Sequence, residues 1–180
     1  MKIFIFLYLH IVYPLYTLWF AMHASLVQEN LSYVGNLDGM HLYFIVWAIM
    51  CETALALGFQ RCLPKCLHAK RLMPWIVISA LLFLISVILP YFPQSHPLSA
   101  QFHIALSFIG LIMILVVIIM MVISLCFSYT IFPYDYLLIL IDGIALGIYG
   151  AHHMSVNSLV EVFLGITLPI YLYHLGGKIS

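Results

Sequence analysis

The stretch from Leu89 to Gly110, LPYFPQSHPLSAQFHIALSFIG, lies between two long apolar runs. Its prolines and aromatic residues predict a turn between two helices. Ser99, Gln101 and His103 occupy the first turns of the second run, which stays apolar to Ile123. Polar groups placed where a helix enters a bilayer are costly unless something satisfies or uses them. The stretch therefore predicts a membrane protein with a polar site near one face of the membrane.

The composition extends this interpretation to the whole chain. The 180 residues are 66% hydrophobic and 7% charged, whereas soluble domains contain about 25% charged residues. A membrane-spanning helix needs about 20 apolar residues, so this length accommodates roughly six helices and no second domain. Lys plus Arg and Asp plus Glu each number 6, so no basic excess indicates nucleic acid. The sequence predicts an all-α, polytopic transmembrane helical bundle of six helices, with residues 1–180 as a single integral membrane domain.

Apolar runs place the transmembrane helices at about 3–24, 40–60, 72–89, 99–127, 136–151 and 158–175. The first run follows a single lysine, as in a signal peptide. However, the run is too long and no small-x-small cleavage site follows, so we expect a retained helix. Ser158 and Glu161 have the spacing of a capping box at the start of the last helix. Gly176 and Gly177 predict its end.

The basic residues predict the orientation of the bundle. Four of the six Lys and Arg residues lie in the loop 61–71, and the other two are Lys2 and Lys178. Six spans place these three regions on one side of the membrane. Because Lys and Arg are enriched in cytoplasmic loops, we expect both termini in the cytoplasm.

The opposite side carries histidines and acids in place of basic residues. The outer loops 25–39, 90–98 and 152–157 contain no Lys or Arg, and six of the nine histidines lie in them or at adjoining helix ends. Acids also lie inside three predicted helices, where burial costs about 2.5–3.5 kcal/mol, so we expect them to face the bundle interior. The candidate ligand-binding residues of the resulting outward-facing pocket are His41, Glu52, Ser99, His103, Asp142, His152, His153, Asn157 and Glu161.

Helical spacing puts several of these residues on shared faces. His41 and Glu52 are about 20° apart around a helix, with Glu52 roughly 16 Å deeper in the membrane. A second stripe comprises Ser99, His103, Ser107 and Gly110. The alternative is that each polar group only forms hydrogen bonds between helices and fixes their packing.

Histidine–carboxylate pairs also suit a divalent metal, and His41, His103 and His153 are the candidate ligands. The Ser99-x3-His103 spacing resembles an element of the intramembrane zinc hydrolases, the ceramidase and adiponectin-receptor-like families. Those families carry a His-x3-His in the last helix, where this chain has only His174. The resemblance implies a metal-dependent lipid hydrolase as one alternative. No His-Glu-x2-His, Gly-x-Ser-x-Gly or Walker motif is present, so the sequence does not establish an enzyme.

A broader resemblance concerns the layout of the chain. A Ser32-x2-Gly35 element precedes the second helix, an aromatic turn at 91–93 precedes His103, and Glu161 lies early in the last helix. In these features the chain resembles the Frag1/DRAM-like group and the related bacterial DUF998 membrane proteins. The resemblance implies a six-helix bundle with a role near lipid handling or membrane trafficking. The Asp38/His41 pair and His152-His153 depart from the pattern.

The leading hypothesis is a small multi-pass membrane protein whose outward-facing pocket, lined by histidines and acids, binds or senses a lipid or small ligand. The first alternative is the intramembrane metal-dependent lipid hydrolase. The second is a membrane subunit of a larger complex or transporter, in which the helices pack against partner subunits or against copies of this chain. The lipid bilayer is the expected environment in all three.

Overall fold

The computed structural model describes residues 2–23, 25–26, 28–92, 95–129 and 158–179. Across these ranges the fold is all-α and no strand forms. Five helical spans of 20, 25, 20, 33 and 21 residues are long and apolar enough to cross a membrane: Lys2–Ala21, His41–Lys65, Ala69–Ile88, Pro97–Tyr129 and Ser158–Lys178. The chain is thus a multi-pass transmembrane bundle, as predicted. The predicted helix at 136–151 lies outside the described residues.

The first span combines α1 (Lys2–Leu7), a π-helical turn η1 (Tyr8–Val12) and α2 (Tyr13–Ala21). A short helix, α3 (Leu31–Gly35), precedes α4 (His41–Cys62), which continues into a 3₁₀ turn, η2 (Leu63–Lys65). The remaining helices are α5 (Ala69–Ile88), α6 (Pro97–Tyr129) and α8 (Ser158–Lys178). The predicted boundaries of the five spans agree with the observed ones to within three residues, except that the second span continues five residues past its predicted end, to Lys65.

The outer surfaces of four spans are apolar. Large exposed side chains include Leu15, Ile49, Trp75 and Phe102. Exposed apolar surface on this scale suits helices that face lipid. In α8, by contrast, half of the residues in its membrane-spanning window are buried, so α8 is the central helix among those described.

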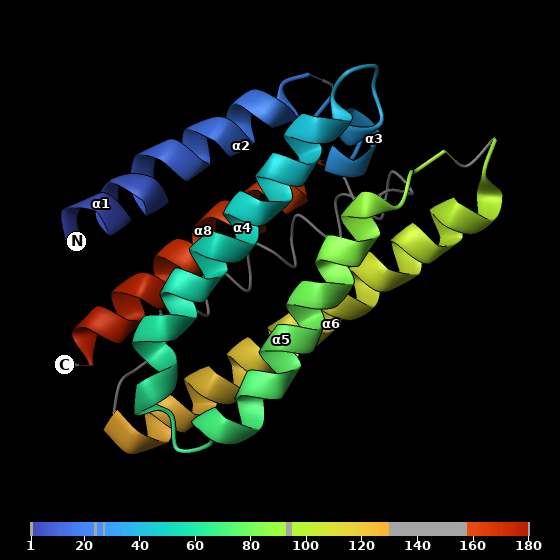
Figure 1. The fold of residues 1–180 in the computed structure, drawn as a ribbon. Coiled ribbons are helices and arrows are strands. Elements are labelled where there is room, and N and C mark those ends of the chain that lie inside the picture. The colour runs from blue at the N-terminus through green and yellow to red at the C-terminus, as the bar shows by residue number, and fades with distance from the viewer. Residues whose placement is uncertain (1, 24, 27, 93–94, 130–157, 180) are drawn as a thin grey trace.

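Two helix pairs form the bundle (Figure 1). α4 packs along α8, with α1 and α2 beside them, and α5 and α6 form an antiparallel hairpin. Small residues allow the close approaches, as is common between membrane helices. A Cβ added at Gly58 of α4 would lie 2.8 Å from the Leu172 Cβ of α8. In the hairpin, Ser79 Oγ donates to the Gly110 carbonyl at 2.7 Å.

Prolines inside the spans are accommodated by neighbouring groups. The Tyr13 N–H bonds five residues back to the Tyr8 carbonyl, so the π-helical turn immediately precedes Pro14, which has no N–H to donate. Pro169 of α8 leaves the Gly165 carbonyl without its usual helical donor. The Tyr13 hydroxyl donates to that carbonyl at 3.0 Å.

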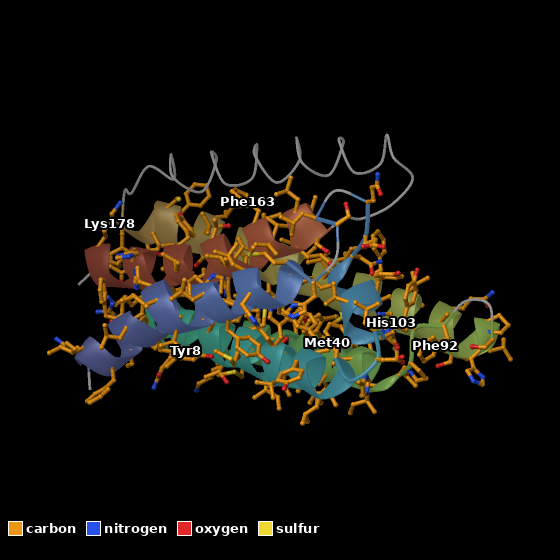
Figure 2. The ribbon with its side chains drawn as sticks, turned by 90° about the horizontal axis from the view of Figure 1, so that it is seen from above. Tyr8, Met40, Phe92, His103, Phe163 and Lys178 are labelled. Atoms are coloured by element: carbon orange, nitrogen blue, oxygen red, sulfur yellow. The ribbon has the colours of Figure 1, made fainter. Side chains whose placement is uncertain are left out.

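The six basic residues belong to the start of α1, the end of α4, η2, the start of α5 and the end of α8. Figure 1 shows that these helix ends and both ends of the chain lie at one end of the bundle. Lys65 Nζ donates to the Gly176 carbonyl at 2.7 Å, and the Arg61 guanidinium lies 4.1 Å above the Tyr173 ring. Figure 2 places Lys178 at this end and His103 and Phe92 at the other. The prediction that Gly176 and Gly177 end the last helix is wrong, because α8 continues to Lys178.

Candidate functional site

A cavity of about 430 Å³ lies between the α4–α8 pair and the α5–α6 hairpin, beneath α3. Most of its lining side chains are aliphatic or aromatic. The polar lining residues are Asn30, Ser32, Glu52, Ser79, Ser86, Tyr91, His103, Ser107 and Glu161. Three of the described candidate residues, Glu52, His103 and Glu161, therefore share one cavity although they come from three different helices.

The two acids of the cavity differ in their hydrogen bonding. Glu161, in the first turn of α8, accepts a bond from the Leu31 N–H at 2.6 Å. Leu31 opens α3, and the first N–H groups of a helix have no partner within the helix, so Glu161 satisfies one of them. Glu52, midway along α4, forms no hydrogen bond with another described residue. It also borders a second hollow, between α4 and α5.

His103 is only 3% exposed, and both of its ring nitrogens are engaged. Nδ1 lies 2.7 Å from the Ser86 carbonyl and 3.2 Å from the Leu89 carbonyl, at the C-terminal end of α5. Since a carbonyl only accepts, Nδ1 carries the proton. In the neutral ring, Nε2 then accepts from the Ser32 hydroxyl at 2.8 Å. His103 thus joins α6 to the end of α5 and to α3.

The segment 28–36, which contains α3, covers the polar end of the cavity and is held by several helices. We call it the α3 segment. Ser158 of α8 donates to the Glu29 carbonyl through its N–H at 2.7 Å and its hydroxyl at 2.9 Å. The Asn36 side chain accepts from the Tyr91 N–H at 3.1 Å. Within the segment, Asn30 caps α3 by accepting from the Tyr33 N–H at 2.7 Å.

These bonds correct the capping-box interpretation of Ser158 and Glu161. In a capping box the two side chains bond to backbone N–H groups of their own helix end. Here Ser158 bonds to Glu29 and Glu161 bonds to Leu31. Both residues attach the α3 segment to the start of α8.

Two further candidates lie away from the cavity lining. His41 is the first residue of α4 and is half-buried at the same end of the bundle. Ser99 donates to the Pro90 carbonyl at 3.1 Å and closes the turn between α5 and α6. Of the predicted stripe, His103, Ser107 and Gly110 line the cavity. The remaining candidates, Asp142, His152, His153 and Asn157, lie outside the described residues.

The candidate metal ligands do not converge in the part of the chain that the structure describes. There, no three His, Cys, Asp or Glu side chains stand close enough to hold an ion. Of the three candidates, His103 has both nitrogens hydrogen-bonded to the protein, and His153 lies outside the described ranges. The Ser99-x3-His103 element that resembled a zinc hydrolase instead bonds to backbone carbonyls around the α5–α6 turn.

Sequence reasoning did not single out Tyr91 or Ser86 for this site. The Tyr91 ring lies 5.3 Å from the His103 ring, centroid to centroid, whereas the sequence identified it only as part of the aromatic turn at 91–93. The Ser86 carbonyl accepts a hydrogen bond from His103 Nδ1. A backbone acceptor of this kind cannot be recognised from the pattern of side chains. The proline after Leu89 is a usable signal, because it indicates that α5 ends there with unpaired carbonyls.

Comparisons with protein-family models, curated proteins and solved structures give no significant match to this chain.

Proposed function

We propose that this protein binds an amphiphilic molecule, a lipid or another small ligand, in the cavity beneath α3. The observation that carries the proposal is a largely apolar cavity into which Glu52, His103 and Glu161 converge. A volume of about 430 Å³ lies within the range of about 300–1,000 Å³ that is typical of small-molecule sites. Apolar walls with a few convergent polar groups are the usual composition of such sites.

Glu52 favours binding over a purely packing role for these polar groups. Protein interiors are close-packed, with few voids larger than a water molecule. A helix bundle that needed polar groups only for packing would pair them, as Ser79 pairs with Gly110. Glu52 instead borders open space at mid-membrane depth and has no hydrogen-bond partner among the described residues. A carboxyl group in that position is costly, and a ligand would offset the cost.

We further propose that the α3 segment faces the outside and that both termini lie in the cytoplasm. The separation of basic residues from the polar end of the cavity supports this orientation. The layout resemblance to the Frag1/DRAM-like and DUF998 proteins involves Ser32, His103 and Glu161, and these three residues meet around the α3 segment. Because that resemblance implies a role near lipid handling, the meeting of these residues favours a ligand that comes from the bilayer.

The test is to fill the cavity and measure what remains bound. Ser107 lines the cavity, and its hydroxyl donates only to the His103 carbonyl of its own helix. Ser107→Phe therefore fills space without breaking a bond between helices. Native mass spectrometry of the protein released from lipid nanodiscs should show a bound small molecule or lipid on the wild type and not on Ser107→Phe.

Ser128→Phe is the matched control, since Ser128 is exposed on the same helix and does not line the cavity. It should retain the bound molecule. The same mass profile for all three proteins would contradict the proposed function.

A further inference from the structure

The serine hydroxyl groups of the cavity have no proton available for a ligand. Ser79, Ser86 and Ser107 each donate to a helix carbonyl, at 2.7, 2.7 and 2.8 Å respectively. The Ser32 hydroxyl donates to His103 Nε2, and the His103 N–H is directed at α5 carbonyls. A hydroxyl has one proton and a neutral imidazole has one, so these five lining residues can only accept further bonds.

The other N–H and O–H groups of the lining supply no hydrogen-bond donor near Glu52. Asn30 and Tyr91 belong to the end of the cavity beneath α3. Trp47 Nε1 has almost no exposed surface and no hydrogen-bond partner among the described residues, so it does not reach into the cavity. No Lys or Arg is among the lining residues. Near Glu52 the lining therefore presents hydrogen-bond acceptors and a carboxyl group that has no partner among the described residues.

The two carboxyl groups of the cavity can accept more hydrogen bonds than they receive. A carboxylate has two oxygens with about four lone-pair positions. Among the described residues, Glu161 receives one hydrogen bond, on Oε2 from Leu31, and Glu52 receives none. Lys70 borders the second hollow that Glu52 also reaches, but no ion pair joins these two side chains. An acid at this depth needs either a proton or a cationic partner.

We infer that the ligand of this cavity is an amphiphilic amine, with an ammonium group paired to Glu52 and an apolar body against the cavity walls. This inference rests on the binding function proposed above and specifies its ligand class. An ammonium group supplies up to three donors and a positive charge, which are the two properties that the lining near Glu52 lacks. Phe44, Phe83 and Phe108 also line the cavity, and aromatic faces attract desolvated cations.

An apolar body distinguishes this ligand from an inorganic cation. A bare ion would be held by oxygen ligands on several sides, whereas most of this lining is aliphatic or aromatic. In the part of the chain that is described, no third carboxyl joins Glu52 and Glu161 in the cavity. The cavity volume of about 430 Å³ likewise fits an organic molecule.

The inference can be tested with three probes that share one tail: decylammonium, decanol and decanoate. Each is titrated calorimetrically into the wild-type protein in lipid nanodiscs, with partition into empty nanodiscs subtracted. Decylammonium should bind at least about tenfold more tightly than decanol, and decanoate should bind most weakly. Glu52→Gln, which keeps the side-chain shape and removes the charge, should reduce the preference for decylammonium to threefold or less.

Glu29→Gln is the charge-matched control. Glu29 is outside the cavity lining, and its carboxylate accepts from the Ser25 N–H at 2.8 Å, a bond that glutamine can also accept. This variant should keep the tenfold preference. The wild-type preference itself tests the inference if Glu52→Gln does not fold.

Equal affinities of decylammonium and decanol for the wild type would overturn the inference while leaving the binding function intact. So would a tenfold preference that survives in Glu52→Gln, or displacement of decylammonium by Na⁺ and not by choline. If none of the three probes binds the wild type above the empty nanodisc, the proposed binding function itself fails.

Discussion

The Tyr13 hydroxyl donates to the Gly165 carbonyl at 3.0 Å, and this is the carbonyl that Pro169 leaves without a donor in α8. Tyr13 is fully buried. Since an unsatisfied carbonyl inside a bilayer is costly, the phenol of the first span compensates for a proline in the central helix. The pair also links two spans that are distant in the sequence.

Replacing Tyr13 by Phe should lower the free energy of unfolding by about 1–2 kcal/mol, because the Gly165 carbonyl loses its donor. A double-mutant cycle with Pro169→Ala checks the cause. Alanine restores a backbone N–H to the helix, so Tyr13→Phe should cost much less in that background. Thermal unfolding in one detergent measures all four proteins, and equal costs in both backgrounds would contradict this explanation.

The Glu161 carboxyl should control the exchange of one specific amide. In Glu161→Ala, the Leu31 N–H loses its acceptor at 2.6 Å, so hydrogen exchange over 28–36 should accelerate by about tenfold, since leaving a buried donor unsatisfied costs about 1–3 kcal/mol. Glu161→Gln keeps a carbonyl oxygen at the same place and should exchange much more slowly than the alanine variant. Equal exchange in the two variants would show that Glu161 does not hold the α3 segment.

Gly176 and Gly177 should respond in opposite ways to alanine. A Cβ at Gly176 would overlap the Arg61 backbone, with its carbonyl carbon at 2.8 Å, whereas a Cβ at Gly177 meets nothing nearer than the flexible guanidinium at 3.6 Å. Alanine favours a helix over glycine by about 0.8–1.0 kcal/mol. Gly177→Ala should therefore be neutral or stabilising in thermal unfolding, and Gly176→Ala should be destabilising by about 1–3 kcal/mol.

The orientation can be tested with single cysteines at opposite ends of the bundle. Ser95 and Lys70 are both exposed, in the α5–α6 turn and at the start of α5 respectively. A membrane-impermeant thiol reagent applied outside intact cells should label Ser95→Cys, and Lys70→Cys should react only after the cells are opened. Labelling of Lys70→Cys from outside would reverse the proposed topology.

The positions of the five described spans follow from the sequence because length and apolarity are local properties of the chain. How far a cavity extends along a helix is harder to predict. His41 and Glu52 share a predicted stripe, yet Glu52 lines the cavity and His41 does not. His41 is the first residue of α4, and the helices that bound the cavity lie elsewhere in the sequence.

The α3 segment was predicted only as a loop, and its anchors were missed. The Asn30 cap is a local signal that indicates a short helix. The bonds from Ser158 to Glu29 and from Leu31 to Glu161 join residues about 130 positions apart. The sequence does not reveal these distant partners, because the same spacing of serine and glutamate also fits a capping box. The sequence placed His103 in a polar site. Its partners in α5 were missed because they are backbone carbonyls, which every residue carries.

The central position of α8 has a consequence for biogenesis. η1, α2 and α4 contact α8, and the Leu31 N–H of α3 bonds to Glu161 of α8, yet each of these elements leaves the ribosome before α8. Until α8 arrives, the Leu31 N–H lacks its acceptor, the Tyr13 hydroxyl lacks its carbonyl, and α4 has no neighbour against Gly58. Membrane insertion and final assembly are therefore separate events for this chain.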